Sequence, residues 1–424
     1  MNRGIDDALK ILQLNYKKKF TVPSNNLYPH QWSWDSGWII YGYCALNETE
    51  KAENELLSLL EGQWDNGLIP SIVFHNKESK DYFPGYKYWD LKNKANKLTS
   101  VYNTTGIVQP PIHSHSCLKI YEKNKDVNFL KKIESKLFKW HKYLYDNRDI
   151  KNEGLVFIRH PWESGMDNSP IWDESLESIE IKEYKYSSKR IDKHKVNEDE
   201  RPTDITYERY MFLIELYKKY KYDEKKISEN CPFLIQDVLF NVLLLKSNYA
   251  LLEIYKILKY QDKIDLVNKW IDKTSNSINT KLFKNDFYYS FDLVRNKLVD
   301  IKTITGLTPI ILNYNVELIK KNLNENFLNS CYKISSLDRS ENVFDPINYW
   351  RGPMWINLSW LIYNGLQNNG YYDLADKIKN TCLNQIETHG FYEYFNSVED
   401  NGCGDNYFSW TASIYISFIT NYKF

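Results

Sequence analysis

Apolar residues recur along much of the chain at the spacing of an amphipathic helix. The positions i, i+3, i+4 and i+7 are apolar in residues 129–144, 207–220, 238–260, 266–282, 355–364 and 371–387. The strict alternation typical of a strand is scarce, and residues 286–293 are its best example. The repeated order of helix, motif-rich loop and helix predicts an all-α fold. It is typical of paired helices in a closed ring, with function in the loops at one end.

The apolar stretches do not indicate secretion or membrane insertion. Residues 1–20 have the pattern of an amphipathic helix and lack the apolar core of a signal peptide. Residues 238–255 are interrupted by Asn, Lys, Ser and Glu, and we interpret them as too polar for a membrane span. The six Cys residues are scattered without a CxxC motif and are interpreted as reduced, buried thiols. We therefore predict a cytoplasmic protein without a membrane partner.

Composition narrows the class of partner. In the 424 residues, 55 Lys and Arg are balanced by 55 Asp and Glu, so no basic excess is available to displace counterions from nucleic acid. Aromatic residues make up 16% of the chain, and several Trp lie beside Asp, Glu or Gln in short motifs. An indole beside a carboxylate suits a sugar, which offers an apolar ring face and hydroxyl edges. A carbohydrate is therefore favoured as substrate, while the oligomeric state stays open, with a homo-oligomer as one alternative.

Aromatic motifs that contain carboxylates are the strongest candidates for chemistry. Motifs of interest lie at residues 28–36, 81–85, 109–113, 160–170, 348–355 and 390–411. Asp and Glu on such loops suit acid–base cleavage of an acetal. One carboxyl must stay protonated to donate to the leaving oxygen, and the other must be ionised to activate water. For any one of these carboxylates taken alone, a structural hydrogen bond or a helix cap is an equal alternative.

Taken in order, the motifs resemble glycoside hydrolase family 63, especially its short members that act on mannosylglycerate and glucosylglycerate. The matching motifs are Gln31-Trp-Ser-Trp-Asp-Ser36, Trp162-Glu-Ser-Gly-Met-Asp167, Tyr349-Trp-Arg-Gly-Pro353, Phe391-Tyr-Glu-Tyr394 and Phe408-Ser-Trp-Thr411. They cover nearly the whole chain. The resemblance implies an (α/α)6 barrel, here a single domain over residues 1–424, and an inverting α-glycoside hydrolase. No cofactor is expected.

The resemblance also implies roles for individual residues. Asp167 is implied to be the general acid and Glu393 the general base, and inversion would place their carboxyls roughly 6.5–9.5 Å apart. The candidates for binding the sugar or closing its pocket are Tyr28, Trp32, Trp34, Asp35, Tyr82, Gln109, Tyr349, Trp350 and Trp410. Trp355 and Trp360 lie inside a helical pattern and are predicted to be core residues. Cys403 departs from the bulkier or charged residue expected there, which leaves the contacts of its loop open.

Several alternatives remain at this stage. Glu163 competes with Asp167 as the acid, and could instead hold Asp167 or bind a sugar hydroxyl. His113 and His115 have no Cys or carboxylate at ligand spacing, so no metal is expected. Other functions are an α-glucosidase or trehalase-like hydrolase on larger glucosides, a sugar isomerase or epimerase, and an inactive carbohydrate-binding protein. The epimerase is disfavoured because few of the eight His lie in the motifs. The inactive protein is disfavoured because both carboxylates are present.

A charged segment precedes one further candidate. Residues 183–203 are rich in Lys, Asp, Glu and Ser, which indicates an exposed loop and a candidate lid, although a solvated loop without a role fits as well. The segment ends in Glu200-Arg-Pro-Thr-Asp204, similar to an Arg-Pro-Thr motif in a mobile, aglycone-facing loop of the short family members. This likeness implies that Arg201 binds a carboxylate on a small aglycone, for which a planar guanidinium is well suited. A surface Arg paired with nearby acids is the alternative, and Arg209 is a weaker candidate.

Overall fold

The computed structural model describes residues 3–75, 82–95 and 100–424, and these residues are mainly helical. The α-helices are α1 (Arg3–Asn15), α2 (Ser33–Ala45), α3 (Thr49–Leu60), α4 (Tyr86–Trp89), α5 (Leu91–Lys94), α6 (His113–Asn124), α7 (Val127–Arg148), α8 (Asp173–Glu177), α9 (Asp204–Lys219), α10 (Glu224–Asn230), α11 (Val238–Leu258), α12 (Gln261–Lys281), α13 (Val316–Asn322), α14 (Ile356–Asn368), α15 (Tyr372–His389) and α16 (Ser409–Ile419). The 3-10 turns are η1 (Pro161–Glu163), η2 (Pro170–Trp172), η3 (Ser187–Lys189), η4 (Asp192–His194), η5 (Glu198–Glu200) and η6 (Ile304–Leu312), and η7 (Leu323–Phe327) is a π-helix.

The strands are two or three residues long. They are β1 (Gln31–Trp32), β2 (Ile72–Phe74), β3 (Asn103–Thr104), β4 (Ile235–Gln236), β5 (Phe283–Lys284), β6 (Phe287–Tyr288), β7 (Phe291–Asp292), β8 (Lys297–Leu298), β9 (Tyr394–Phe395) and β10 (Gly402–Cys403). All their pairings are antiparallel, in the orders β1-β2-β3, β4-β7-β8, β5-β6 and β9-β10. The strand expected at 286–293 is present only as the separate strands β6 and β7. The mainly helical fold is therefore confirmed, with short hairpins between the helices.

The predicted amphipathic helices correspond to α1, α7, α9, α11, α12, α14 and α15. Two helices that carry site motifs, α2 and α16, were not predicted. Every residue from Ser33 to Cys44 in α2 and from Ser409 to Phe418 in α16 is buried. A helix that is buried on all sides has no polar face, so its sequence lacks the helical period. Periodicity missed these two helices, although it found α14, in which every residue from Ile356 to Leu366 is also buried.

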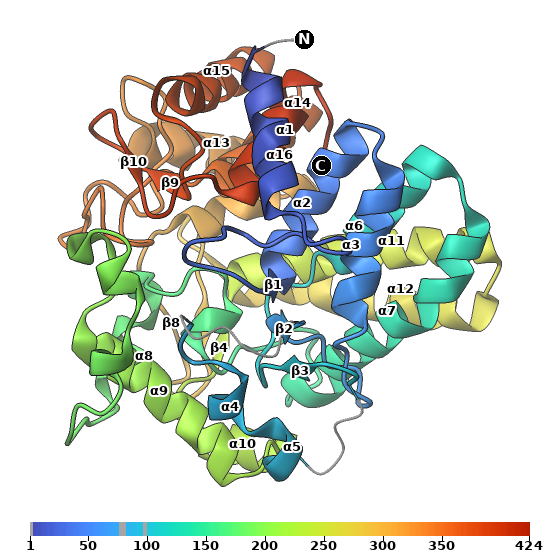
Figure 1. The fold of residues 1–424 in the computed structure, drawn as a ribbon, viewed down its shortest axis with the longest axis vertical. Helices are drawn as coiled ribbons and strands as arrows, with labels where there is room; N and C mark the ends of the chain where they lie inside the picture. The colour runs from blue at the N-terminus through green and yellow to red at the C-terminus, as the bar shows by residue number, and fades with distance from the viewer. Residues whose placement is uncertain (1–2, 76–81, 96–99) are drawn as a thin grey trace.

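A cycle of packed elements surrounds the centre of the described chain. α2 packs on α6, α6 on α11, α11 on η6, η6 on α14, α14 on α16, and α16 on α2. A second helix lies against each of them: α3 on α2, α7 on α6, α12 on α11, α13 on η6, α15 on α14 and α1 on α16. Figure 1 shows α1 and α16 side by side, so the first and last helices of the chain meet.

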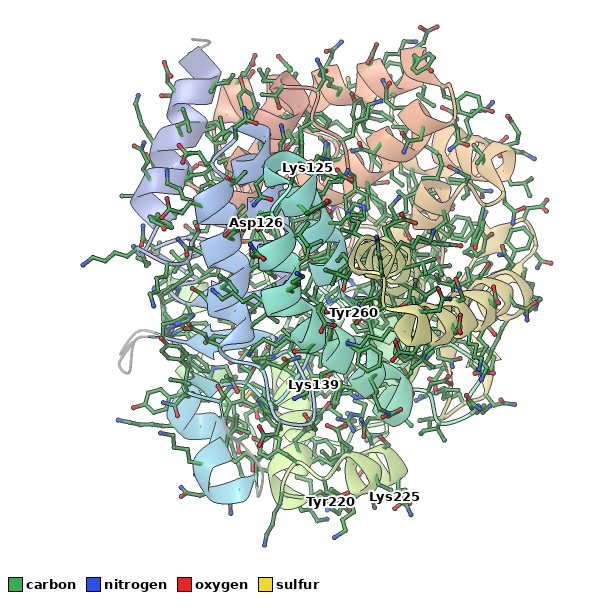
Figure 2. All side chains as sticks on the ribbon, turned by 90° about the vertical axis from the view of Figure 1, so that its right-hand side faces the viewer. Lys125, Asp126, Lys139, Tyr220, Lys225 and Tyr260 are labelled. Atoms are coloured by element: carbon green, nitrogen blue, oxygen red, sulfur yellow. The ribbon has the colours of Figure 1, made fainter. Side chains whose placement is uncertain are left out.

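Helix α11 explains the most apolar stretch of the sequence. Its mean hydropathy of 1.2 and its length would allow it to span a membrane, contrary to the sequence-based expectation. However, 83% of that stretch is buried inside the protein, against α6, α7, α12 and η6. Figure 2 shows the neighbouring hairpin turns, with Lys125 and Asp126 between α6 and α7 and Tyr260 between α11 and α12. Burial within the protein thus accounts for the composition of α11.

Candidate active site

Two adjoining cavities lie at one end of the helix cycle. The first is lined by Pro23, Tyr28, Trp32, Trp34, Asp35, Gln109, Gly165, Asp167, Tyr349, Glu393, Phe408 and Trp410. The second is lined by Leu27, Tyr28, Trp32, Tyr82, Phe83, Pro84, Trp162, Asp167, Arg190, Ile191, Asp192, Arg201, Pro202, Tyr207, Tyr210 and Tyr349. Asp167 belongs to both linings. Many of these residues lie at or just before the N-termini of α2, α6, α14 and α16, which places the cavities where these helices begin.

The start of α2 supplies the aromatic wall of the first cavity. Trp32 is half-buried, while Trp34 and Asp35 are buried in the first turn of the helix. The backbone N–H of Trp34 donates to the side-chain oxygen Oε1 of Gln109 at 3.0 Å, which ties this turn to the segment before α6. Among the described residues, Asp35 Oδ1 is buried without a hydrogen-bond partner. Burial, reinforced by the charge of Glu393, raises the pKa of Asp35 well above its usual range.

Glu55 holds that turn from behind and was not found from the sequence. Its carboxylate accepts from the Ser36 hydroxyl at 2.5 Å, the Gln31 side-chain amide at 2.9 Å and the Thr21 backbone N–H at 2.7 Å. Gln31 and Ser36 flank the two Trp and the Asp of the motif. These two motif residues therefore bind Glu55. In the sequence, Glu55 is one acidic residue among several in an amphipathic helix, so no signal distinguishes it.

Asp167 lies in a tight loop between η1 and η2. Gly165 has φ +72°, and a Cβ there would lie 3.0 Å from the indole nitrogen of Trp34, so this turn against the cavity wall requires glycine. The Tyr210 hydroxyl donates to the backbone oxygen of Asp167 at 2.6 Å. Burial and then the negative charge of Glu393 raise the pKa of Asp167 to about 7, although Arg201 opposes the shift. A carboxyl with this pKa can be protonated near neutral pH.

Glu163 lies outside both cavity linings. Its buried carboxylate forms a two-point ion pair with Arg148, at 2.9 and 3.0 Å. The backbone N–H groups of Arg159, at 2.6 Å, and Val108, at 3.3 Å, donate to it as well. Despite burial, the Arg148 charge and these hydrogen bonds lower its pKa. Of the alternatives given for Glu163, holding Asp167 fits this arrangement, because protein groups fill its acceptor positions and it anchors the loop that carries Asp167.

Glu393 is buried immediately before β9, and its carboxylate accepts from four groups. Oε1 accepts from the hydroxyls of Tyr28 at 2.9 Å and Tyr349 at 2.7 Å. Oε2 pairs with Nη2 of Arg201 at 3.1 Å and accepts from the backbone N–H of Asp405 at 3.4 Å. These four donors together hold the carboxylate in one position.

The backbone of Glu393 is fixed by the loop that follows it. Its N–H donates to the Asp405 oxygen at 2.8 Å, and its own oxygen accepts from the Trp410 indole at 3.1 Å. Gly404 has φ +71°, and a Cβ there would lie 2.5 Å from Oε2 of Glu393, so the loop can approach only as glycine. Cys403 is buried opposite Tyr394 in the β9–β10 pair and lines neither cavity. The residues of this loop that approach Glu393 are Gly404 and Asp405, next to Cys403.

The charged segment 183–203 is exposed or half-buried, as predicted, except at Arg190, Arg201 and Pro202, which are buried. Arg190 and Arg201 are 2% and 5% exposed and line the second cavity. Arg190 pairs with Asp192 at 2.6 Å and donates to the Pro202 oxygen at 2.6 Å, which closes the segment on itself. Arg201 donates to the Tyr28 hydroxyl at 3.1 Å as well as to Glu393. The sequence predicted Arg201 at the site, whereas Arg190 and Asp192 were hidden among many charged neighbours. Arg209 donates to the Ile179 oxygen at 3.4 Å and lines neither cavity.

The structure brings most of the predicted site residues together, and Trp350 is the exception besides Glu163. Tyr28, Trp32, Trp34, Asp35, Gln109, Tyr349 and Trp410 line the first cavity, and Tyr82 lines the second. Trp350 is 1% exposed, has φ +61° and is stacked on Trp355 at 3.5 Å between ring centroids. Trp355 and Trp360 are fully buried, as predicted. Trp350 therefore belongs to this aromatic core, and Tyr349 beside it contributes to the cavity. Asp81, in the motif 81–85, lies outside the described residues.

Aromatic residues on α9 and the final loop were missed. Tyr207 and Tyr210 line the second cavity, and Phe408 lines the first. In the sequence the two tyrosines belong to an ordinary amphipathic helix, so only their position in the fold identifies them.

The two histidines considered as metal ligands have other partners. His113 and His115 form hydrogen bonds with the hydroxyls of Ser33 and Tyr41, at 2.8 and 2.5 Å. Within the described residues, no group of three or more His, Cys, Asp or Glu is arranged to hold a metal ion.

Free thiols are found at every Cys of the described chain. Cys44, Cys117, Cys231, Cys382 and Cys403 are buried. Cys331 is exposed, contrary to the expectation that all six thiols are buried, because it lies in the loop after the π-helix η7. None of these thiols lines either cavity. The chemistry of the site is therefore that of carboxylates, aromatic rings and guanidinium groups.

Two carboxyl groups, those of Asp167 and Glu393, that line one aromatic cavity are the arrangement of a glycoside hydrolase. Comparison with known proteins agrees. Residues 28–411 match the family described as Mannosylglycerate hydrolase MGH1-like glycoside hydrolase domain. The chain belongs to this family and is a glycoside hydrolase, and the predicted membership of glycoside hydrolase family 63 is confirmed.

Individual relatives span nearly the whole chain. A mannosylglycerate hydrolase of Rubrobacter radiotolerans is 37% identical, over 98% of this chain and 96% of the relative. A glucosylglycerate hydrolase of Mycolicibacterium hassiacum is 29% identical, over 97% of this chain and 96% of the relative. The crystal structure of a family 63 mannosylglycerate hydrolase from Thermus thermophilus, in complex with Tris and D-glycerate, has a TM-score of 0.88 at 34% identity. That likeness covers 98% of this chain and 100% of the other.

Proposed function

We propose that the protein hydrolyses a small α-glycoside of glycerate, with mannosylglycerate first and glucosylglycerate second among the substrates to test. One observation carries the proposal: Asp167 lines both cavities, whereas Glu393 lines only the first and Arg201 only the second. A sugar in the first cavity and a carboxylate-bearing aglycone in the second would place the glycosidic oxygen beside Asp167. Relatives named for both substrates support the choice.

Asp167 is the proposed general acid. Burial and the charge of Glu393 raise its pKa to about 7, so much of the enzyme carries a protonated Asp167 at neutral pH. That proton is transferred to the glycosidic oxygen as its bond to the sugar breaks, so the aglycone leaves with a hydroxyl group instead of an alkoxide. The hydrogen bond from Tyr210 to the backbone of Asp167 keeps the carboxyl at the junction of the cavities.

Glu393 is the proposed general base. It takes a proton from a water that attacks the anomeric carbon from the face opposite the leaving group, so the product has the inverted configuration. This route requires the two carboxyls to be roughly 6.5–9.5 Å apart, with room for the water between them. Both line the first cavity, and Glu393 contributes to the raised pKa of Asp167, which supports their proximity.

The remaining lining residues divide into sugar and aglycone binding. Asp35 has a buried carboxyl in the first cavity that can accept hydrogen bonds from sugar hydroxyls. Trp34 and Trp410 line the same cavity. Tyr82 and Arg201 line the second cavity, where a guanidinium can hold a carboxylate by two parallel hydrogen bonds. Gln109 has its Oε1 occupied by Trp34 and can offer its amide N–H groups to the sugar.

We further propose that the helix cycle is an (α/α)6 barrel and that residues 1–424 act as one domain. The cyclic contacts of α2, α6, α11, η6, α14 and α16, each with a second helix packed on it, support this architecture. Residues 183–203 are proposed as a lid, because they supply one wall of the second cavity. Movement of this wall would admit substrate and then exclude bulk water.

Product analysis tests the proposed function. The purified protein is incubated with mannosylglycerate, glucosylglycerate, trehalose and methyl α-mannoside, and NMR follows the first anomer released. We expect rapid cleavage of one glycerate glycoside and initial release of the β-anomer of the sugar. Retained configuration would reject the roles of Asp167 and Glu393. Faster cleavage of trehalose than of both glycerate glycosides would reject the substrate.

A further inference from the structure

The general base has no free acceptor position in this structure. A carboxylate offers about four lone-pair sites. Those of Glu393 are taken by the hydroxyls of Tyr28 and Tyr349, by Nη2 of Arg201 and by the backbone N–H of Asp405. A water that is to lose its proton to Glu393 must first donate a hydrogen bond to it. Catalysis therefore requires one of the four present donors to leave.

Three of the four donors are held by rigid surroundings. The N–H of Asp405 belongs to a loop fixed by the hydrogen bond from Glu393 N–H to the Asp405 oxygen at 2.8 Å. The Tyr349 ring packs edge-on against Trp350, Trp355 and Tyr394. The Tyr28 ring packs edge-on against Trp32 and Phe408. Displacing any of these would disturb the cavity wall itself.

Arg201 is the donor that can leave. Its guanidinium lines the second cavity, while its partner Glu393 lines the first. Besides Glu393, its guanidinium contacts only the Tyr28 hydroxyl, at 3.1 Å, and the Tyr349 ring, at 4.7 Å, among the contacts seen in the described residues, so its release moves one side chain and no cavity wall. Its buried Nε has no hydrogen-bond partner among the described residues. A buried cationic group with an unused donor lacks an acceptor that a ligand can supply.

We propose that Arg201 caps the base in the free enzyme and is drawn off it by the carboxylate of the aglycone. The ligand carboxylate in the second cavity offers two oxygens to Nε and one Nη of Arg201, in place of the single oxygen of Glu393. Glu393 then keeps three donors and gains an open position for water. The proposal rests on the proposed function, and adds that the aglycone switches on the base as well as binding.

The consequence for specificity is that a neutral aglycone can bind but does not activate Glu393 as a base. If Arg201 left Glu393 with no carboxylate to receive it, a buried guanidinium would be unpaired, which is strongly unfavourable. A glycoside without the carboxylate thus meets an enzyme whose base remains capped. Discrimination should appear in kcat as well as in KM. A residue that only bound the aglycone tightly and uniformly would change KM alone.

Glycosyl fluorides separate the two roles, because they leave the aglycone cavity empty. The experiment measures fluoride release from α-D-mannosyl fluoride and α-D-glucosyl fluoride, with increasing D-glycerate or, as the matched neutral control, glycerol. We expect D-glycerate to raise kcat on the accepted fluoride by about tenfold or more, and glycerol to have no such effect. Simple inhibition by D-glycerate, equal effects of the two additives, or no fluoride release under any condition would overturn the proposal.

Variants at Arg201 give an independent readout. Without D-glycerate, Arg201→Ala should hydrolyse the fluoride several-fold faster than the wild type and should not respond to D-glycerate. A folded Arg201→Ala that is slower than the wild type on the fluoride would show that the guanidinium assists the base, and would overturn the cap. If that variant does not fold, activation of the wild type by D-glycerate still decides whether Arg201 caps Glu393. Cleavage of a glycerate glycoside without glycerate activation of the fluoride would reject the cap and leave the proposed function intact.

Discussion

The two cavities meet at Asp167, but the carboxyl there and the carboxyl of Glu393 are held in different ways. Glu393 accepts hydrogen bonds from four groups, one of them a guanidinium. Asp167 receives its main support at its backbone oxygen, from Tyr210, while burial and the charge of Glu393 raise its pKa. The difference brings the pKa of Asp167 to about 7, a value that suits a general acid at neutral pH.

Glu163 extends the comparison within a single loop. It lies four residues before Asp167, yet Arg148 and two backbone N–H groups lower its pKa, whereas that of Asp167 is raised. Both carboxyls belong to the same sequence motif. Their different surroundings assign one to anchoring the loop and leave the other for chemistry.

Removal of either proposed catalytic carboxyl should give the largest effect. We expect Asp167→Asn and Glu393→Gln each to reduce kcat on the accepted glycerate glycoside on the order of 10²–10⁴-fold, because each loses a proton transfer. Thermal unfolding of Asp167→Asn should stay close to that of the wild type, since a neutral amide resembles the protonated acid. Turnover within tenfold of the wild type in either variant would refute that residue's role.

The anchoring role of Glu163 predicts a loss of stability. Glu163→Gln removes the charge that faces the buried Arg148, and breaking a buried pair on one side costs about 3–5 kcal/mol in the free energy of unfolding. Denaturant titration measures the loss, with Asp167→Asn as the matched control four residues away. A Glu163→Gln variant that is as stable as the wild type but has no turnover would indicate that Glu163, and not Asp167, is the general acid.

The pH dependence of kcat/KM reports the acid. In its proposed role Asp167 works when protonated, so activity should fall as pH rises through about 7. The charge of Arg201 lowers the pKa of Asp167, so Arg201→Ala should raise that pKa and shift the basic limb to higher pH. A basic limb that shifts to lower pH in this variant would contradict the described electrostatics of the site.

Substitution of Trp410 or Trp350 should change kcat/KM less than the loss of a catalytic carboxyl changes kcat, and the two tryptophans should differ from each other. The Trp410 indole donates to the Glu393 backbone oxygen at 3.1 Å and lines the first cavity, so Trp410→Phe should lower kcat/KM by about tenfold, the equivalent of one hydrogen bond. Trp350→Phe, in the aromatic core, should leave kcat/KM within about twofold while lowering the unfolding temperature. Steady-state kinetics of the pair checks both, and equal kinetic losses would place Trp350 functionally with the cavity.

Sequence patterns located the site better than they described it. The aromatic motifs pointed to Asp167 and Glu393, and the likeness of Glu200-Arg-Pro-Thr-Asp204 to a family motif pointed to Arg201; the structure places all three at the two cavities. The same strings contain Trp350 and Glu163, which face the core, and a motif does not say which way each member points. Glu55 was missed because its role depends on three contacts to residues 19 to 34 positions away in the sequence. Helix periodicity likewise failed for α2 and α16, whose burial on every side comes from tertiary packing.

The meeting of the first and last helices has a consequence for biosynthesis. Tyr28 and Asp35 leave the ribosome early, yet Glu393 and Trp410, which complete the same cavity, follow more than 350 residues later. Until α16 emerges, α2 has no partner on one side, and its apolar surface is exposed on the nascent chain. Domains generally fold as units during synthesis, and such exposed surface is prone to aggregation. Shielding of the early helices by a chaperone should therefore matter most until α16 has been synthesised.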